Sequence, residues 1–347
     1  MSHAALFPRL AAALLGAWWL SAAAVAQPPA ATTAPPSIED RSRALQRASD
    51  AVVGVLARAV DGASSARTLG RQRQGSGVVI GGDGLVLTIG YLILEAEQVM
   101  LRTDDGRDIP ARVVAYDLAT GFGLVQALAP LRLAAVTLGR AGTLGDDEPL
   151  MIASGGQSGA VSVARMVSRR PFSGYWEYHV DGALFTSPPR SDHSGAGLFN
   201  GRGELVGIGS LMVADALGAA GPPRPGNMFV PTDLLLPILD ELRARGRSAA
   251  SERAWLGINC VEHAGGVRVV RVNPDSPADV AGLLPGDRIV RIDGVEVEGL
   301  ERLWKTLWSG PVPEREVTLE IQREGATRTV KVHTVDRAKT LRRAQGV

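Results

Sequence analysis

Short apolar runs, separated by glycine and aspartate turns, dominate the first two thirds of the chain. Each run is four to six residues long, which is typical of a β-strand in a compact domain. The runs cover residues 52–56, 77–80, 85–88, 98–102, 111–116 and 205–208. This spacing favours an antiparallel sandwich or barrel over alternating strand and helix units. Helices are predicted at the two ends of this region, over residues 38–50 and 231–243.

A second pattern begins after the small and polar residues 245–253, which predict a linker. Two predicted helices, 278–281 and 300–308, interrupt a further series of strands. These strands are expected at residues 255–260, 267–272, 288–292, 316–323 and 327–332. Leu300, Leu303 and Leu307 recur at helical spacing and predict a buried face. Residues 254–336 therefore read as a compact α+β module, followed by a loose polar tail at 337–347.

The N-terminal segment has the organisation of a secretory signal. An apolar run at residues 10–20 follows Arg9, and the small residues Ala24-Val25-Ala26 predict cleavage before Gln27. A retained membrane anchor is the alternative, but the apolar stretch of about 16 residues is short of the roughly 20 that a span needs. Residues 27–45, which begin with a Pro/Ala/Thr-rich stretch, predict a flexible tether. The mature protein is therefore expected to be exported, to the bacterial periplasm, with no membrane span.

Composition excludes several classes of protein. With 45% hydrophobic residues the chain is too apolar to be disordered, and a net charge of +1 gives no bulk attraction to nucleic acid. The only cysteine, Cys260, excludes an internal disulfide and a multi-cysteine zinc site, and we expect it to be a small buried residue. Neither a cofactor nor a metal is expected.

Several motifs in residues 50–245 resemble the HtrA/Deg family of trypsin-fold serine proteases. They are GSGVVI at 75–80, DGLVLT at 83–88, DGRDIPARVV at 105–114, SGAGLFN at 194–200 with GELVGI at 203–208, and GNMFVP at 226–231. The resemblance implies a mainly β fold, a trypsin-like double six-stranded β-barrel, over residues 46–244. It also implies that Ser194 stands at the position of the family's nucleophile.

The rest of the family's catalytic triad is replaced. A serine protease needs a histidine to take the serine proton and an aspartate to orient that histidine. Aligned on the family's motifs, the histidine position is Tyr91 in TIGY at 88–91, and the aspartate position is Gly121 in DLATG at 117–121. The oxyanion turn consists of Asp192, His193 and Ser194, and a carboxylate at 192 opposes the negative charge that develops there.

Another base for Ser194 is hard to find in the sequence. His193 is its direct neighbour, and consecutive side chains rarely face each other well enough for proton transfer. His179 lies in a strand-like run and is more typical of a structural histidine. No lysine precedes Lys305, and a tyrosine with its ordinary pKa near 10 is a poor base at neutral pH.

The second module resembles a PDZ domain of the HtrA type. Its motifs occur in order: WLGI at 255–258, SPA at 276–278, AGL at 281–283, GD at 286–287 and IDG at 292–294. The resemblance implies that Trp255, Leu256, Gly257 and Ile258 form a peptide-binding turn, whose backbone N–H groups face a peptide carboxylate. Trp304 and Trp308 either border the same groove or belong to the core.

These features together predict a catalytically inactive, PDZ-containing HtrA-like protein of the bacterial envelope. Its expected partners are peptides or misfolded proteins with apolar C-termini, in protein quality control. One alternative is an active serine endopeptidase that uses a non-standard base at Ser194. A second is an assembly or regulatory subunit of active HtrA-type proteases, since members of this family usually form trimers. No nucleic-acid partner is expected.

Overall fold

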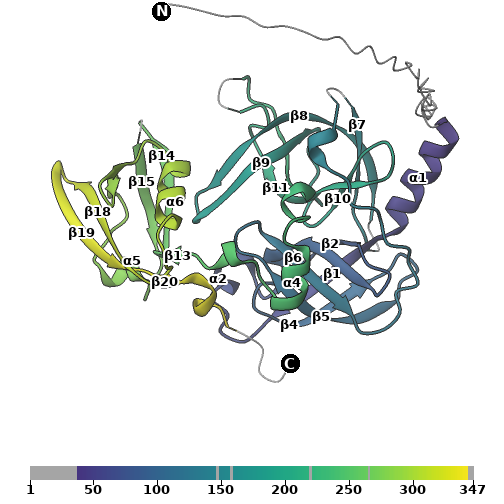
Figure 1. Ribbon diagram of the computed structural model, residues 1–347, viewed down its shortest axis with the longest axis horizontal. Helices are drawn as coiled ribbons and strands as arrows, with labels where there is room; N and C mark the ends of the chain where they lie inside the picture. The colour runs from purple at the N-terminus through teal and green to yellow at the C-terminus, as the bar shows by residue number, and fades with distance from the viewer. Residues whose placement is uncertain (1–36, 146–147, 157–158, 219–220, 265, 343–347) are drawn as a thin grey trace, which may run out of the picture. The chain divides into compact units, whose positions relative to one another are not determined.

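The first set of predicted strands closes into a β-barrel in the computed structural model (Figure 1). The structure describes residues 37–145, 148–156, 159–218, 221–264 and 266–342, so the predicted signal segment 1–26 lies outside it. The barrel order is β1-β2-β3-β6-β5-β4, with antiparallel neighbours. The bounds are β1 Val52–Ala59, β2 Gln72–Val79, β3 Leu85–Ile89, β4 Ala96–Arg102, β5 Asp108–Tyr116 and β6 Phe122–Ala127. Two short helices lie between these strands, α2 Ala66–Leu69 and α3 Gly90–Ile93.

A second barrel follows, in the order β10-β11-β12-β9-β8-β7. Its strands are β7 Pro149–Ala153, β8 Val161–Gly174, β9 Tyr178–Ser187, β10 Gly197–Phe199, β11 Leu205–Val213 and β12 Gly226–Pro231, with the 3-10 turn η1 Ala141–Thr143 before them. The longest strands, β8 and β9, form a hairpin whose register runs to the pair Gly174↔Tyr178. Residues 175–177 form the turn at the tip of this hairpin.

The third region is the expected α+β module. Its main sheet has the order β14-β15-β16-β18-β19, with α5 and α6 alongside, and a separate pair β13-β20. The elements are β13 Ala254–Trp255, β14 Ile258–His263, β15 Gly266–Val272, α5 Pro277–Val280, β16 Arg288–Ile292, β17 Val295–Glu296, α6 Leu300–Trp308, β18 Glu316–Arg323, β19 Ala326–His333 and β20 Val335–Asp336. The mainly β architecture of a double barrel followed by an α+β module is thereby confirmed.

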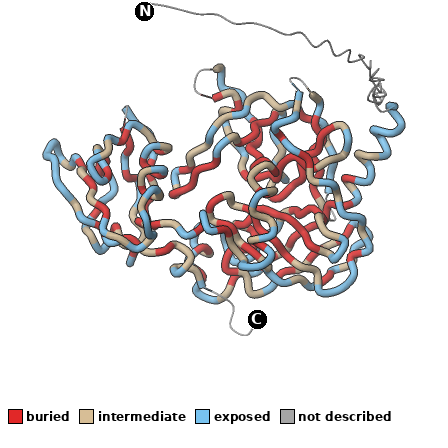
Figure 2. The backbone as a smooth tube through the Cα atoms, viewed as in Figure 1, coloured by how far each residue is buried: buried red, intermediate tan, exposed pale blue. Residues whose placement is uncertain are grey.

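Buried residues are concentrated along the barrel strands (Figure 2). All of β3 is buried, because it lies between β2 and β6 with its two faces covered. The predicted face of α6 is confirmed, since Leu300, Leu303 and Leu307 are buried together with Trp304. Cys260 is buried as expected. Among the described residues, no helix is both long and apolar enough to cross a bilayer.

Two predicted helices differ in their outcome. Helix α1, Ile38–Asp50, is confirmed; it begins at Ser37, whose hydroxyl accepts a hydrogen bond from the Asp40 N–H, so the predicted tether cannot extend to residue 45. The helix predicted over 231–243 is wrong at its start. Pro231 still belongs to β12, the 3-10 turn η2 Thr232–Leu234 follows, and α4 spans only Leu239–Arg245, because Pro237 cannot donate a helical hydrogen bond.

The predicted linker is anchored to the first barrel. It forms the 3-10 turn η3, Ala249–Ser251, and its residues Ser248 and Ser251 are buried. Asp117, at the end of β5, accepts hydrogen bonds from the Ser248 N–H at 3.0 Å and from both serine hydroxyls. Its other carboxylate oxygen accepts from the N–H and hydroxyl of Thr120. Burial acts to raise the pKa of Asp117, but these hydrogen bonds outweigh it and hold the pKa below its ordinary value.

The expectation of a loose tail is wrong for residues 337–342. The 3-10 turn η4, Arg337–Thr340, is capped by the Asp336 side chain. Beyond it, the Arg342 N–H donates to Glu95 Oε1 at 2.9 Å, so the chain returns to the first barrel. Glu95 is buried and needs such donors, which is the physical reason why this polar segment is ordered. Residues 343–347 lie outside the described part of the chain.

Candidate functional site

Tyr91 and Ser194 meet between the two barrels. Tyr91 lies on α3, directly after β3, and Ser194 lies in the turn before β10. The phenolic oxygen of Tyr91 is 2.8 Å from Ser194 Oγ and 2.8 Å from the carbonyl oxygen of Ser210. A carbonyl can only accept, so both contacts are hydrogen bonds only if Tyr91 donates to Ser210 and Ser194 donates to Tyr91.

The protonation state of Tyr91 limits what this pair can do. Burial raises the pKa of Tyr91 to about 12, and the hydrogen bond with Ser194 offsets only part of that effect. At neutral pH the phenol is therefore protonated and its only proton is directed to a backbone carbonyl. It can hold the Ser194 hydroxyl in place, but it is a poor acceptor for the proton that a nucleophilic serine must lose.

Gly121 leaves no room for an aspartate. Its φ is +83°, in the region that favours glycine. A Cβ at this position would lie 2.8 Å from the Tyr178 hydroxyl. That hydroxyl donates to the Thr120 carbonyl at 2.6 Å and comes from β9. The place that an orienting carboxylate would need is therefore filled by Tyr178, a residue that the sequence did not single out.

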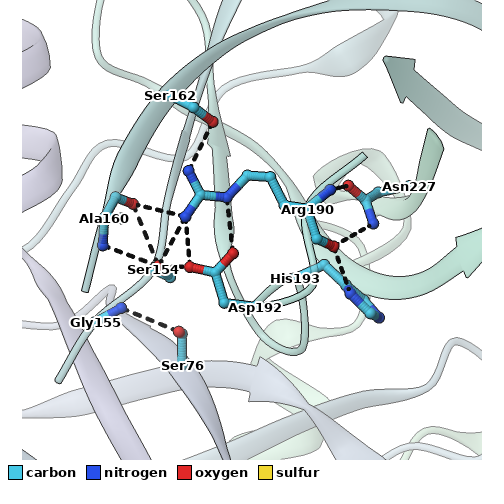
Figure 3. Close-up of polar contacts among 9 residues, drawn as sticks. All are labelled: Ser76, Ser154, Gly155, Ala160, Ser162, Arg190, Asp192, His193 and Asn227. Atoms are coloured by element: carbon cyan, nitrogen blue, oxygen red, sulfur yellow. Dashed lines mark hydrogen bonds and ion pairs between the residues drawn. The ribbon is translucent and has the colours of Figure 1, made fainter. Parts of the chain in front are cut away.

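Asp192 is paired with a cation. Arg190 contacts both carboxylate oxygens of Asp192, one of them at 2.9 Å, and the Ser154 hydroxyl also donates to it (Figure 3). Burial acts to raise the pKa of Asp192, but the hydrogen bonds from Arg190 and Ser154 lower it overall, so the group is ionised. The negative charge beside Ser194 is thus compensated, and its effect on an oxyanion is smaller than the sequence alone implies.

The two histidines considered from the sequence have other partners. His193 Nδ1 lies 3.0 Å from the carbonyl oxygen of Arg190 (Figure 3). His179 is buried in the β8–β9 hairpin, with Nδ1 2.9 Å from Ser173 Oγ and Nε2 3.0 Å from Asp181 Oδ1. Neither contact directs an imidazole nitrogen at Ser194.

His179 also belongs to the one cluster of possible metal ligands among the described residues. Its ligand atom lies within 4.8 Å of those of Asp181 and Glu301. Lys305 Nζ already contacts both carboxylates, at 3.1 Å and 2.7 Å. An ammonium group occupies the oxygens that a cation would use, so the cluster is an ion-pair network rather than a cation site.

A cleft of about 380 Å³ opens beside Ser194. Its walls come from β1, β2, the end of β4 and the loops after β7 and before β10, and they include Arg102, Ser154, Asp192 and Ser194. Gly195, at the base of the turn, has a φ of +74°, and a Cβ there would lie 2.0 Å from the Ser76 carbonyl oxygen. Close packing on β2 thus holds the Ser194 turn in a conformation that requires glycine.

The second predicted site is the turn of residues 255–258. The N–H groups of Leu256, Gly257 and Ile258 all point at one carboxylate, that of Glu177 from the β8–β9 turn. Gly257 has a φ of +86°, and a Cβ there would lie 2.2 Å from the Cβ of Ser276, so only glycine fits. Trp255 has a different place: its backbone pairs with Val335 in β13-β20 and its ring lies under the Arg337 guanidinium.

Besides Tyr178, two functional candidates, Glu177 and Arg190, were missed from the sequence. Arg190 has no sequence signal beyond its proximity to Ser194. Glu177 follows the aromatic pair Tyr175-Trp176 between two β-type runs, a conspicuous composition for a hairpin tip. Nothing in the sequence, however, relates that tip to a turn 80 residues further along the chain.

Comparisons with known proteins match both regions. The trypsin-like peptidase domain family matches residues 75–208 and the PDZ domain family matches residues 254–334. The probable periplasmic serine endoprotease DegP-like of Pseudomonas fulva is 29% identical over 281 residues, covering 76% of this chain and 57% of that protein. The corresponding protein of Hahella chejuensis is 28% identical over 275 residues, covering 75% and 56%. This chain thus spans just over half the length of these curated relatives.

A solved structure shares the fold. The HtrA-type protease AlgW with a tripeptide is 22% identical, with a TM-score of 0.53 over 86% of this chain and 97% of that one. A likeness at this identity establishes the trypsin-like and PDZ architecture and nothing finer. The exported, periplasmic location expected from the sequence is confirmed by the periplasmic relatives.

Proposed function

We propose that this chain, which belongs to the HtrA/DegP family of trypsin-fold serine proteases with a PDZ domain, binds peptides or misfolded proteins in the periplasm without cleaving them. The observation that carries the loss of cleavage is the pair Tyr91–Ser194. Tyr91 stands at the position of the proton acceptor, its pKa is raised to about 12 by burial, and its proton is directed to Ser210. Tyr178 at the place of the orienting aspartate supports the same conclusion.

The purified protein is expected to show no Ser194-dependent cleavage of unfolded casein. Loss of triad members costs on the order of a millionfold in kcat, so the remaining rate lies below ordinary detection. The wild type and Ser194→Ala should therefore release casein fragments at the same rate as a mock preparation. A fluorophosphonate probe should leave Ser194 unlabelled, because the probe reacts with an activated hydroxyl.

Cleavage that disappears in Ser194→Ala but persists in the wild type would contradict the proposal and favour the active endopeptidase. So would labelling at Ser194. The mock preparation controls for contaminating proteases, and the far-ultraviolet circular dichroism of the variant should match that of the wild type.

Peptide binding is supported by the turn at Leu256, Gly257 and Ile258. Its three N–H groups converge on a carboxylate within the structure, and this geometry supports recognition of a peptide's terminal carboxylate. They are backbone atoms and do not depend on the triad. The structural neighbour AlgW has been solved with a tripeptide and with a decapeptide, and we extend peptide recognition from that protein to this chain.

Binding should depend on the peptide's terminal carboxylate. Hydrogen bonds to a charged group contribute roughly 1.5–3 kcal/mol, so amidation of the C-terminus should weaken binding about tenfold or more. A labelled decapeptide ending in Leu-Val, in free-acid and amidated forms, would be titrated against the full chain by fluorescence anisotropy. Equal affinities for the two forms would show that the groove does not recognise a chain terminus.

A further inference from the structure

The carboxylate of Glu177 is held as a bound peptide terminus would be. The Gly257 and Ile258 N–H groups donate to Oε1 at 2.7 Å and 3.0 Å, and the Leu256 N–H donates to Oε2 at 3.1 Å. Glu177 is buried, so the carboxylate has exchanged water for these three donors. Capture of a carboxylate by successive backbone N–H groups is the recognition chemistry of a C-terminal peptide.

The backbone of the residues before Glu177 also lies against β14 as a bound peptide would. The Cys260 N–H, on β14, donates to the Tyr175 carbonyl oxygen at 2.8 Å. Residue 177 therefore lies opposite 258 and residue 175 opposite 260, so the segment runs antiparallel to β14. Alternate backbone groups of a strand face the same side, as required for a peptide added to a sheet edge.

The helix on the other side of the groove also contacts the hairpin. Trp304, buried on α6, donates its indole N–H to the Gly174 carbonyl oxygen at 3.0 Å. Lys305, also on α6, contacts Asp181 of β9 at 3.1 Å. The Trp176 ring stacks on the Tyr178 ring, with ring centroids 5.7 Å apart. Trp176 at the tip therefore packs against a residue of β9 in the second barrel. Strand β14 and helix α6, which border the groove, thus contact the same hairpin. The second barrel and the PDZ module belong to one compact unit, Ser37–Val347.

We propose that the PDZ groove is closed by an internal ligand, the segment Tyr175-Trp176-Glu177 of the β8–β9 hairpin, and that a peptide binds only by displacing the Glu177 carboxylate. The inference rests on the proposed peptide-binding function and adds its regulation. Two carboxylates cannot share one set of three donors, since like charges would be buried side by side. The apparent affinity for a peptide is then reduced by the fraction of molecules in which the groove is open.

Glu177→Ala should open the groove. The same free-acid decapeptide ending in Leu-Val is expected to bind this variant at least tenfold more tightly than the wild type, in fluorescence anisotropy with the full chain. Glu177→Gln retains the side-chain volume and an acceptor but loses the charge, so its affinity should lie between the two. Glu296→Ala removes an exposed glutamate of β17 in the same module and should bind like the wild type.

Hydrogen exchange tests the internal contact without any peptide. The amides of Leu256, Gly257 and Ile258 should exchange at least tenfold faster in Glu177→Ala than in the wild type, while the amides of β18 remain unchanged. This readout also shows that the variant is folded. Unchanged exchange at the three amides in both Glu177 variants would overturn the proposal, as would equal peptide affinity of the wild type and Glu177→Ala.

Failure of the proposed peptide-binding function can be distinguished from failure of the proposed internal ligand. Faster exchange in Glu177→Ala with no peptide binding by any variant would refute the peptide-binding function and the competition together, and would leave the groove as a fixed dock for the hairpin. Slow exchange in every variant, combined with tight binding by the wild type, would leave the peptide-binding function intact and refute the internal ligand alone.

Discussion

Asp117→Asn is expected to lower the free energy of unfolding by about 2–3 kcal/mol. Asp117 is fully buried and acts only as an acceptor, with donors from Ser248, Ser251 and Thr120 on its two oxygens. An amide places an NH₂ group against at least one of these donors, and an unsatisfied buried polar group costs about 1–3 kcal/mol, more where charge is involved. Urea denaturation at pH 7 measures the difference. The matched control is Asp240→Asn on the exposed side of α4, which should remain within about 0.5 kcal/mol of the wild type.

The difference between the wild type and Asp117→Asn should shrink in acid. The pKa of Asp117 is lower in the folded protein than its ordinary value near 3.9, so its contribution is fully present above that value. It is lost as the pH falls through the folded pKa, because the unfolded chain takes up its proton at a higher pH than the folded protein does. The asparagine variant has no such proton to bind. A stability gap of the same size at pH 7 and below pH 3 would contradict the assignment of this carboxylate.

Restoration of a working triad is expected to require three substitutions rather than two. Tyr91→His with Gly121→Asp supplies a base and its orienter, but the new aspartate would collide with the Tyr178 hydroxyl in a backbone conformation that favours glycine. We expect this pair to remain inactive on casein. Adding Tyr178→Phe removes the colliding oxygen, and the rate should then rise by about 10²–10⁴-fold, the usual contribution of general-base catalysis.

Changes in the oxyanion turn should matter less than Tyr178. Asp192→Gly and Ala196→Gly remove the carboxylate and a methyl group from the turn, but Arg190 already compensates the Asp192 charge. Each background would be assayed beside its own Ser194→Ala partner, so that only serine-dependent cleavage is counted. If the glycine substitutions rescue Tyr91→His with Gly121→Asp and Tyr178→Phe does not, the obstruction lies in the turn and not beneath Gly121.

Local pattern accounts for much of the fold. Helix α6 and strands β16 and β18 have the bounds that the sequence predicts, and α6 and β18 are single periodic runs with one buried face. The predicted helix at 231–243 failed where Pro231 and Pro237 interrupt an apolar stretch, which hydrophobic period alone does not reveal. The prediction of a loose tail failed for a different reason. Residues 337–342 are polar, and their order comes from the hydrogen bond between Arg342 and Glu95, which is 247 residues away in the chain.

The candidate sites likewise combine positions that local motifs predict with contacts that arise from the fold. Motifs of local spacing were enough to predict Ser194, Tyr91, Gly121 and the glycine turn at Gly257 as site positions. The groups that surround these positions are visible in the folded protein alone. The direction of the Tyr91 proton, the Tyr178 hydroxyl against Gly121 and the Glu177 carboxylate on the turn at Gly257 all join segments far apart in the chain. Such contacts depend on how the two barrels and the module pack, and neither composition nor periodicity encodes that geometry.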